Sequence, residues 1–246
     1  MLYWDRPTLK DRAKAVLKKS YGWSLLVTWL YGMISGTNGF QVIWNRDFNF
    51  RDFSSIGQFF ERNRFFGLFS GLIGITVVFG ILLAIFVFRL FEIGQARFFF
   101  SSRYGTVQFG EVFHGFKGGY YVSNVKTMFL RDLYVFAWSL LFVVPGIIKS
   151  YSYWMVPYIL AENPNLPTER VLEISERTMQ GEKGETFVLQ LSFLGWQLLG
   201  TLACGIGVIL VQPYIQATYA ELYGALRAKA VNTGICTRDE LGADVA

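Results

Sequence analysis

The sequence has little of what enzymes and metal proteins use at their sites. Its 246 residues contain one histidine, His114, and two cysteines, Cys204 and Cys236. A single histidine excludes paired-histidine metal sites, the HExxH helix and most arrangements in which histidine activates a nucleophile. Two cysteines are too few for a disulfide framework and are expected to be structural thiols. We therefore predict no catalytic residue, no metal ligand and no cofactor.

Nucleotide-binding loops are absent as well. The glycines between Gly67 and Gly80 lie in an apolar run. They lack the Gly-Lys-Ser/Thr ending with which a P-loop holds phosphates. Gly67 and Gly71 instead fit the spacing that lets two helices approach closely.

Charge is scarce, and one long run has none. Charged residues make up 17% of the chain and hydrophobic residues 52%, against about 25% charged in an average soluble domain. The stretch Phe65–Phe88 lies uncharged between Arg64 and Arg89. As a helix it is long enough to cross a hydrocarbon layer of about 30 Å. We predict an all-α integral membrane protein, because in lipid each backbone polar group must be paired within protein.

The apolar pattern predicts one domain, a transmembrane helical bundle with about six membrane segments and interfacial amphipathic helices. Its expected parts are a basic amphipathic helix (1–20), a first span (21–36), an extracytoplasmic aromatic loop (37–64), membrane segments within 65–88, 128–161 and 187–226, a cytoplasmic surface helix (167–180) and a polar tail (230–246). The stretch Arg89–Lys126 between them is expected to be a cytoplasmic loop, packed under the bundle as a lid.

The basic residues fit this topology. With both termini in the cytoplasm, 18 of the 23 Lys and Arg residues lie on that side, as the positive-inside rule requires. This explains the net charge of +5 without a nucleic-acid partner. A five-span alternative leaves 15 of the 23 inside, with 208–226 at the interface because it contains Gln212, Gln216 and Glu221.

Two segments are amphipathic. In the N-terminal helix, for which Thr8 is the expected cap, Leu9, Ala13, Val16 and Leu17 share one face. Lysines and arginines cover the rest, so this helix is expected to lie on anionic lipid headgroups. In the 167–180 helix the shared face holds Val171, Ile174, Ser175 and Met179, and Gly181 is expected just past its end. Ser175, Met179, Gly181 and Lys183 are either a docking face or a cap on the bundle, with Lys183 reaching to the surface.

Prolines are expected to break the membrane helices. Pro145-Gly146 ends the 128–144 segment, and Pro157 kinks the next one. The strings Pro157-Tyr158-Ile159 and Pro213-Tyr214-Ile215 form a faint internal repeat. Paired broken helices indicate a midplane binding site in transporters. Three matching residues are few, and chance or packing convenience is the favoured explanation.

Ionisable and aromatic residues leave two interpretations open. Arg131, Asp132 and Glu221 lie nearest the hydrocarbon, where such groups are functional candidates. They are otherwise a structural pair, joining Arg131 to Asp132 or to Glu221. The aromatic residues either line a pocket or form an interfacial belt; they are Tyr151, Tyr153, Trp154, Tyr158, Trp196 and Tyr214.

Four strings in the second half are characteristic together: PGIIKSYSYWMVPYILAENP, SERTMQGEK, FVLQLSFLGWQLL and PYIQATYAELY. With them the chain resembles the bacterial membrane-protein family known as domain of unknown function 975. The resemblance covers most of the chain and is strongest from Pro145 to Tyr223. It implies a multi-pass protein of the bacterial cytoplasmic (inner) membrane whose activity is not established. The aromatic segment Phe40–Arg64 does not match the family pattern.

We expect a non-enzymatic binding, scaffolding or lipid-interacting accessory of a membrane or envelope system. Its expected partners are membrane lipids and an unidentified membrane or cytoplasmic protein. The alternative is a small transporter or permeation pathway around Arg131, Asp132 and Glu221. A water-filled cavity reached by Tyr158, Gln212, Gln216 or Glu221 would favour transport. A tightly packed interior with a cytoplasmic groove would favour scaffolding.

Overall fold

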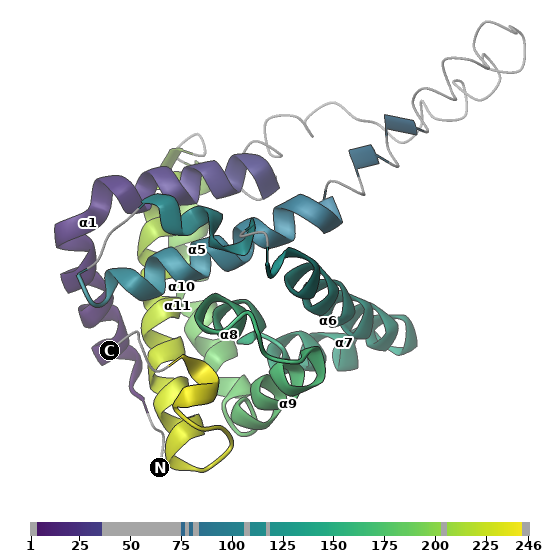
Figure 1. Ribbon diagram of the computed structural model, residues 1–246. Coiled ribbons are helices and arrows are strands. Elements are labelled where there is room, and N and C mark those ends of the chain that lie inside the picture. Colours follow the sequence, from purple (N-terminus) through teal and green to yellow (C-terminus); the bar gives the residue numbers. More distant parts are fainter. Residues whose placement is uncertain are drawn as a thin grey trace, which may run out of the picture.

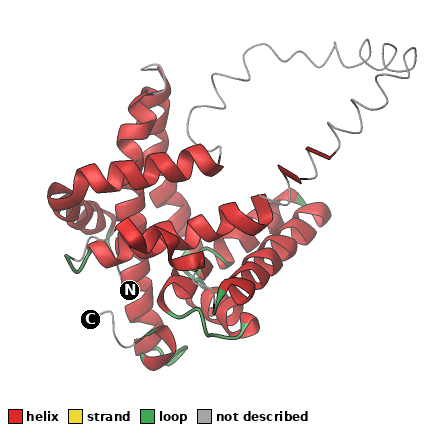
Figure 2. Cartoon of the chain, turned by 45° about the horizontal axis from the view of Figure 1, so that its top comes forward, coloured by secondary structure: helices red, strands yellow, loops and turns green. Residues whose placement is uncertain are grey.

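The computed structural model describes residues 4–35, 75–76, 79–80, 84–105, 109–116, 119–202 and 206–242. Within these ranges the chain forms eight α-helices and no strand (Figures 1 and 2), which confirms the all-α prediction. The aromatic loop predicted at 37–64, most of the run Phe65–Phe88 and Cys204 lie outside the described residues. None of the helices in the described ranges is at once long enough and apolar enough to cross a membrane.

Helix α1 (Arg6–Ser35) changes direction at the predicted boundary near residue 20. Ser20 has φ −133° and ψ 17°, outside helical geometry, and Figure 1 shows the two halves pointing in different directions. Leu9, Ala13 and Leu17 are buried, which confirms the predicted apolar face. This face packs on the rest of the protein, because α1 runs along α11. The N-cap is Asp5, not Thr8: its carboxylate accepts bonds from the Thr8 hydroxyl at 3.0 Å and amide at 3.4 Å.

Helix α5 (Arg89–Ser102) is the centre of the core. It follows a short π-helix (Ala84–Phe88), and most of its residues are buried, including Phe98, Phe99 and Phe100. The prediction of a loop was wrong here, because this stretch has no helix breaker and its aromatic residues need burial. The expectation that it packs against the bundle was right. The 3₁₀ helix Phe109–Phe116 lies against α5 so closely that a Cβ on Gly94 would be 1.7 Å from the Val112 carbonyl oxygen.

Helices α6 (Tyr121–Leu141) and α7 (Val143–Ser152) form a hairpin. The chain turns at Phe142, which is extended with φ −156° and ψ 147°. The predicted break at Pro145-Gly146 was therefore three residues late. Pro145 lies in the first turn of α7, where its missing N–H costs no helical hydrogen bond. Gly146 lets the two helices meet, because a Cβ there would be 2.8 Å from Cα of Ser139.

A short buried helix and a surface helix follow. The chain turns at Tyr153–Met155 before α8 (Val156–Glu162), which has Pro157 near its start and all seven residues buried. This confirms the kink predicted near Pro157. Helix α9 (Thr168–Thr178) buries Val171, Ile174 and Ser175, followed by buried Met179. Gly181 has φ +82°, as expected for the residue past a helix end.

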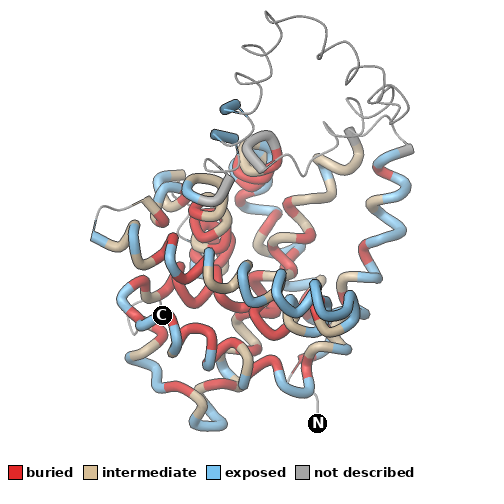
Figure 3. Tube along the Cα trace, turned by 90° about the vertical axis from the view of Figure 1, so that its right-hand side faces the viewer, coloured by how far each residue is buried: buried red, intermediate tan, exposed pale blue. Residues whose placement is uncertain are grey.

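Helices α10 (Lys183–Leu202) and α11 (Ile206–Asn232) pack side by side. Helix α11 continues through Pro213, so the predicted break was wrong. Helix α1 supports α11 here: the Tyr21 hydroxyl donates to the Leu210 carbonyl at 2.9 Å. Because Pro157 starts a helix and Pro213 lies inside one, the three-residue repeat is not a structural repeat. Figure 3 shows buried positions concentrated in the middle of the bundle.

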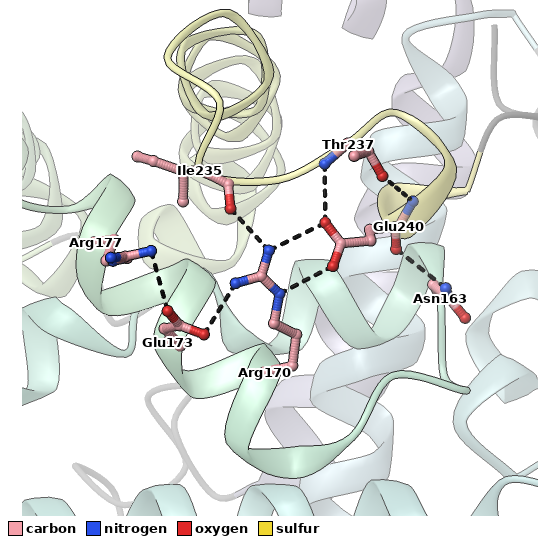
Figure 4. Close-up of polar contacts among 7 residues, drawn as sticks. All are labelled: Asn163, Arg170, Glu173, Arg177, Ile235, Thr237 and Glu240. Atoms are coloured by element: carbon pink, nitrogen blue, oxygen red, sulfur yellow. Dashed lines mark hydrogen bonds and ion pairs between the residues drawn. The ribbon is translucent and has the colours of Figure 1, made fainter.

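The chain after α11 folds back onto α9 (Figure 4). Arg170 donates to both carboxylate oxygens of Glu240, at 2.9 and 3.1 Å, and to the Ile235 carbonyl at 2.9 Å. The Asn163 amide donates to the Glu240 carbonyl at 3.0 Å. We call this set of contacts the tail clasp. Within it burial raises the pKa of Cys236 to about 11, so its thiol stays protonated.

Two glycine substitutions, one in the contact between α6 and α7 and one outside it, should have opposite effects on stability. Gly146→Ala should lower the free energy of unfolding by about 1–3 kcal/mol, because the new methyl group overpacks the contact with Ser139. Gly195→Ala, in α10 where a new methyl group would meet no atom within 4 Å, should raise it by roughly 0.5–1 kcal/mol through helix propensity. Denaturant unfolding followed by circular dichroism measures both. Equal effects would contradict the close contact.

The tail clasp should open in acid. Hydrogen bonds from Arg170 hold the pKa of Glu240 below its ordinary value. Its contribution to stability is therefore present above that ordinary pKa and is lost as the pH falls through the lowered one. Glu240→Gln should give faster amide hydrogen exchange over 233–242 at neutral pH, and acid should produce the same change in the native chain. Glu169→Gln, an exposed change on α9, is the control. An unchanged exchange rate in Glu240→Gln would contradict the clasp.

Candidate functional site: a polar aromatic cavity

A cavity of about 390 Å³ lies where α1, α5, α6, α7, α8, α10 and α11 converge. Its wall is mostly polar and aromatic. The aromatic residues are Tyr31, Tyr151, Tyr153, Trp154, Tyr158 and Tyr219, the amides Gln95, Gln190 and Gln216, the charged residues Glu92, Arg131 and Asp132, and the remainder Ala96, Val135, Ser150 and Pro157. Pockets that bind small molecules have this size and are found between the helices of bundles.

Four charged groups meet at one side of the cavity. Arg131 on α6 donates to both oxygens of Glu92 on α5, at 3.0 and 3.2 Å. It also donates to Oδ1 of its neighbour Asp132 at 3.0 Å. Arg89 lies 3.2 Å from Oε2 of Glu92 and 2.7 Å from Oδ2 of Asp132. We call these four residues the charge quartet.

The charge quartet is neutral and joins two helices. Each helix contributes one arginine and one carboxylate, and all four carboxylate oxygens have an arginine partner. The four side chains are partly buried, from 11% exposed for Arg131 to 42% for Arg89, and charges removed from water need pairing and hydrogen bonds. The quartet therefore fixes α5 against α6 and leaves this wall of the cavity without net charge.

Aromatic rings form the facing wall. The rings of Trp154 and Tyr158 have centroids 5.4 Å apart, and Tyr219 meets Trp154 edge to face at 5.7 Å. Tyr158 stacks on Tyr223 of α11 at 4.8 Å. The Tyr151 hydroxyl is held by Gln190 at 2.5 Å. Each of the three tyrosines of this wall therefore contacts a neighbouring ring or side chain.

Several neutral polar groups of the wall have no hydrogen-bond partner among the described residues. Gln95 and Tyr158 are only 5% and 6% exposed. The Gln95 side-chain amide and the Tyr158 hydroxyl nevertheless make no hydrogen bond to another described residue. The Trp154 indole N–H, the Tyr219 hydroxyl and the Gln216 amide belong to half-buried residues and likewise make no hydrogen bond to another described residue. These groups are therefore available to a molecule in the cavity.

Comparison with known proteins gives one match. The family model described as protein of unknown function (DUF975) matches residues 12–230. The chain belongs to the DUF975 family. Neither the curated proteins nor the solved structures contain a match to this DUF975 protein.

Four of the predicted site residues lie together in the DUF975 cavity: Arg131, Asp132, Pro157 and Tyr158. The pairing of Arg131 with Asp132 is confirmed. Its alternative pairing with Glu221 is wrong, because Glu221 binds Arg103 at 2.9 Å on another side of α11. Of the predicted aromatic set, Tyr151, Tyr153, Trp154 and Tyr158 line the cavity and Trp196 and Tyr214 do not.

The other predicted residues have structural positions. Pro145 and Gly146 begin α7, and Pro213 and Tyr214 lie in α11, where Tyr214 packs edge to face on Phe193. Trp196 is exposed on α10. Ser175 donates to the Ser152 carbonyl at 2.8 Å and Met179 is buried, so they hold α9 to α7 and the core. Gly181 and Lys183 connect α9 to α10.

Sequence reasoning missed the contribution of α5. Glu92 and Gln95 were placed in a cytoplasmic loop, and Tyr31, Gln190 and Tyr219 were not considered as site residues. One signal was available: Arg89 and Glu92 are three residues apart, as are Glu92 and Gln95, which places all three on one helix face. His114 lies outside the cavity, 3.8 Å from Glu111. No group of three His, Cys, Asp or Glu residues in the described ranges is arranged to hold a metal.

The charge quartet predicts a large difference between two Arg→Met substitutions. Arg131→Met removes the buried arginine and should cost about 3 kcal/mol, because Glu92 and Asp132 are left with Arg89 alone. Arg177→Met removes an exposed pair with Glu173 and should cost less than about 1 kcal/mol. Denaturant unfolding measures both.

Adding Glu92→Met to Arg131→Met should recover part of the loss, because a neutral Arg89–Asp132 pair remains. Equal losses in Arg131→Met and Arg177→Met would show that the quartet does not stabilise the fold.

Proposed function

We propose that this DUF975 protein is a non-enzymatic, polytopic membrane protein that binds a small polar solute in its central cavity and carries it across the membrane. The observation that carries the proposal is the cavity itself, in which unpaired neutral polar groups face a space between helices. Such a site binds a ligand, but it lacks a nucleophile with an adjacent base, so binding is favoured over catalysis.

The residues that line the cavity favour transport over scaffolding. Tyr158 and Gln216 line it, and both belong to the set whose exposure to a cavity would favour transport. Gln212 and Glu221, the other two members of that set, do not line the cavity, and Glu221 is buried in a pair with Arg103. The proposed solute path is therefore built on Arg131, Asp132, Tyr158 and Gln216, with Glu221 holding the helices together. The path uses the break before Pro157 and does not need a break at Pro213.

Membrane insertion is supported by exposed apolar side chains. The turn of the α6–α7 hairpin and the adjoining positions are apolar and largely exposed, with Phe142 at 69%. One side of α10 is likewise apolar and exposed. Large exposed apolar patches mark contacts with membranes or proteins. The exposed residues include Phe136, Leu140, Leu141, Phe142, Val143, Val144, Ile147 and Ile148 of the hairpin, and Leu191, Leu194, Trp196, Leu198 and Leu199 of α10.

With the uncharged run Phe65–Phe88, these surfaces support a transmembrane bundle in the bacterial cytoplasmic membrane, with both termini in the cytoplasm. The basic half of α1 adds a lipid contact: Arg12, Lys14, Lys18 and Lys19 are exposed, and each cation near an anionic leaflet contributes about 1 kcal/mol. This basic surface is also the feature that best supports an accessory role in the envelope.

Thiol labelling tests both parts of the proposal. In a Cys204→Ser background, Cys236 stays unreactive because it is buried and its pKa is raised. Ser150→Cys, at the exposed edge of the cavity wall, should react with a membrane-impermeant maleimide in intact membrane vesicles of one orientation. Leu194→Cys, on the exposed apolar side of α10, should react only after detergent is added, because lipid covers it.

Two outcomes would overturn the proposal. If Leu194→Cys reacts in intact vesicles as fast as Ser150→Cys, lipid does not cover α10 and the proposed membrane insertion is wrong. Failure of Ser150→Cys to react in vesicles of either orientation would show that the cavity is closed to solutes.

A further inference from the structure

We infer that the cavity takes a neutral, polyhydroxylated solute of the sugar or polyol class. This inference rests on the proposed function and specifies its ligand. It follows from which groups of the wall are already paired and which are not.

The charged groups of the wall are already paired. Each oxygen of Glu92 and Asp132 accepts from Arg131 or Arg89, at distances between 2.7 and 3.2 Å. A cationic ligand would find each carboxylate oxygen of the described cavity wall already bonded to an arginine. An anionic ligand would have to displace Glu92 from Arg131, which leaves the partly buried Glu92 carboxylate with Arg89 alone. Charged solutes are therefore disfavoured.

The neutral groups are the ones without partners. Gln95 and Gln216 each offer an amide N–H and a carbonyl oxygen, Tyr158 and Tyr219 each offer a hydroxyl, and Trp154 offers an N–H. Donors and acceptors are thus mixed within one small space. A ligand that satisfies them must itself carry several groups that both donate and accept, which is the property of hydroxyl groups. A site built in this way rejects analogues that lack those groups.

The aromatic rings of the wall also suit a sugar, because they can pack against its apolar C–H faces. Trp154 and Tyr219 meet at an interplanar angle of 89°, so their faces form a corner. Aromatic side chains of this kind have an apolar face and a polar edge. A sugar ring has the complementary shape, with apolar C–H faces and a rim of hydroxyls. At about 30 Å³ per water molecule, the 390 Å³ cavity has room for a solute of monosaccharide size.

Protection from labelling tests the inference. The Ser150→Cys variant, in the Cys204→Ser background, is placed in phosphatidylcholine vesicles without glycoside detergent. Maleimide labelling is measured with rising concentrations of glucose, mannose, N-acetylglucosamine, myo-inositol or glycerol, and separately of choline, glutamate or inorganic phosphate. At least one neutral solute should slow labelling in a saturable way, and the charged solutes should not.

Two amide substitutions one helical turn apart give the matched control. Gln216→Leu removes an unpaired cavity amide and should raise the half-protecting concentration at least tenfold. Gln212→Leu makes the same change on α11 outside the cavity wall and should leave it unchanged. Circular dichroism of both variants checks that they are folded.

The outcomes separate the two proposals. Protection by choline, glutamate or phosphate that Gln216→Leu abolishes would overturn the neutral-solute inference and leave the solute-binding function standing. Labelling of Ser150→Cys that no solute slows would overturn the inference. Neutral-solute protection that is the same in both Gln→Leu variants would also overturn it, because the solute would then act elsewhere.

Discussion

The structure depends on the burial of α5 on nearly every side. This helix packs on α1, α8, α11 and the 3₁₀ helix Phe109–Phe116, so its charged side chains are at most partly exposed. Burial of a carboxylate there requires arginine partners, and these come from one turn back on α5 and from α6. The charge quartet is therefore a consequence of where α5 lies. Three members of the quartet in turn line the cavity, together with aromatic residues of α7, α8 and the turn between them.

Local signals in the sequence predicted local structure well. The apolar faces of the basic helix and of α9, the change near residue 20, the role of Gly181 and the kink near Pro157 all depend on residues within one or two helical turns. The break at Pro145 was predicted three residues late, because the first turn of a helix accepts proline and the sequence does not show which helix the proline starts. Helix α11 continues through Pro213, and α1 packs along α11 in a contact that joins residues far apart in the chain.

The candidate site was predicted in part. Arg131, Asp132 and Tyr158 were selected because polar groups among apolar residues are unusual, and all three line the cavity. Glu92 was not selected, because a short stretch with two arginines and a glutamate is typical of a loop and only the docked partner on α6 shows otherwise. The aromatic residues divided between the two interpretations: those around the α7–α8 turn line the cavity, whereas Trp196 is exposed. Sequence alone could not divide them, because which helices meet around the cavity is decided by contacts between residues far apart in the chain.

The arrangement of charges in the quartet has a consequence for how the two helices separate. Arg89 bonds to Glu92 within α5, and Arg131 bonds to Asp132 within α6, in addition to the bonds that cross the contact. When α5 and α6 move apart, each arginine therefore keeps a carboxylate on its own helix and no member of the quartet is left as an isolated ion. Local opening of this contact loses the ion pairs between the helices and keeps those within them.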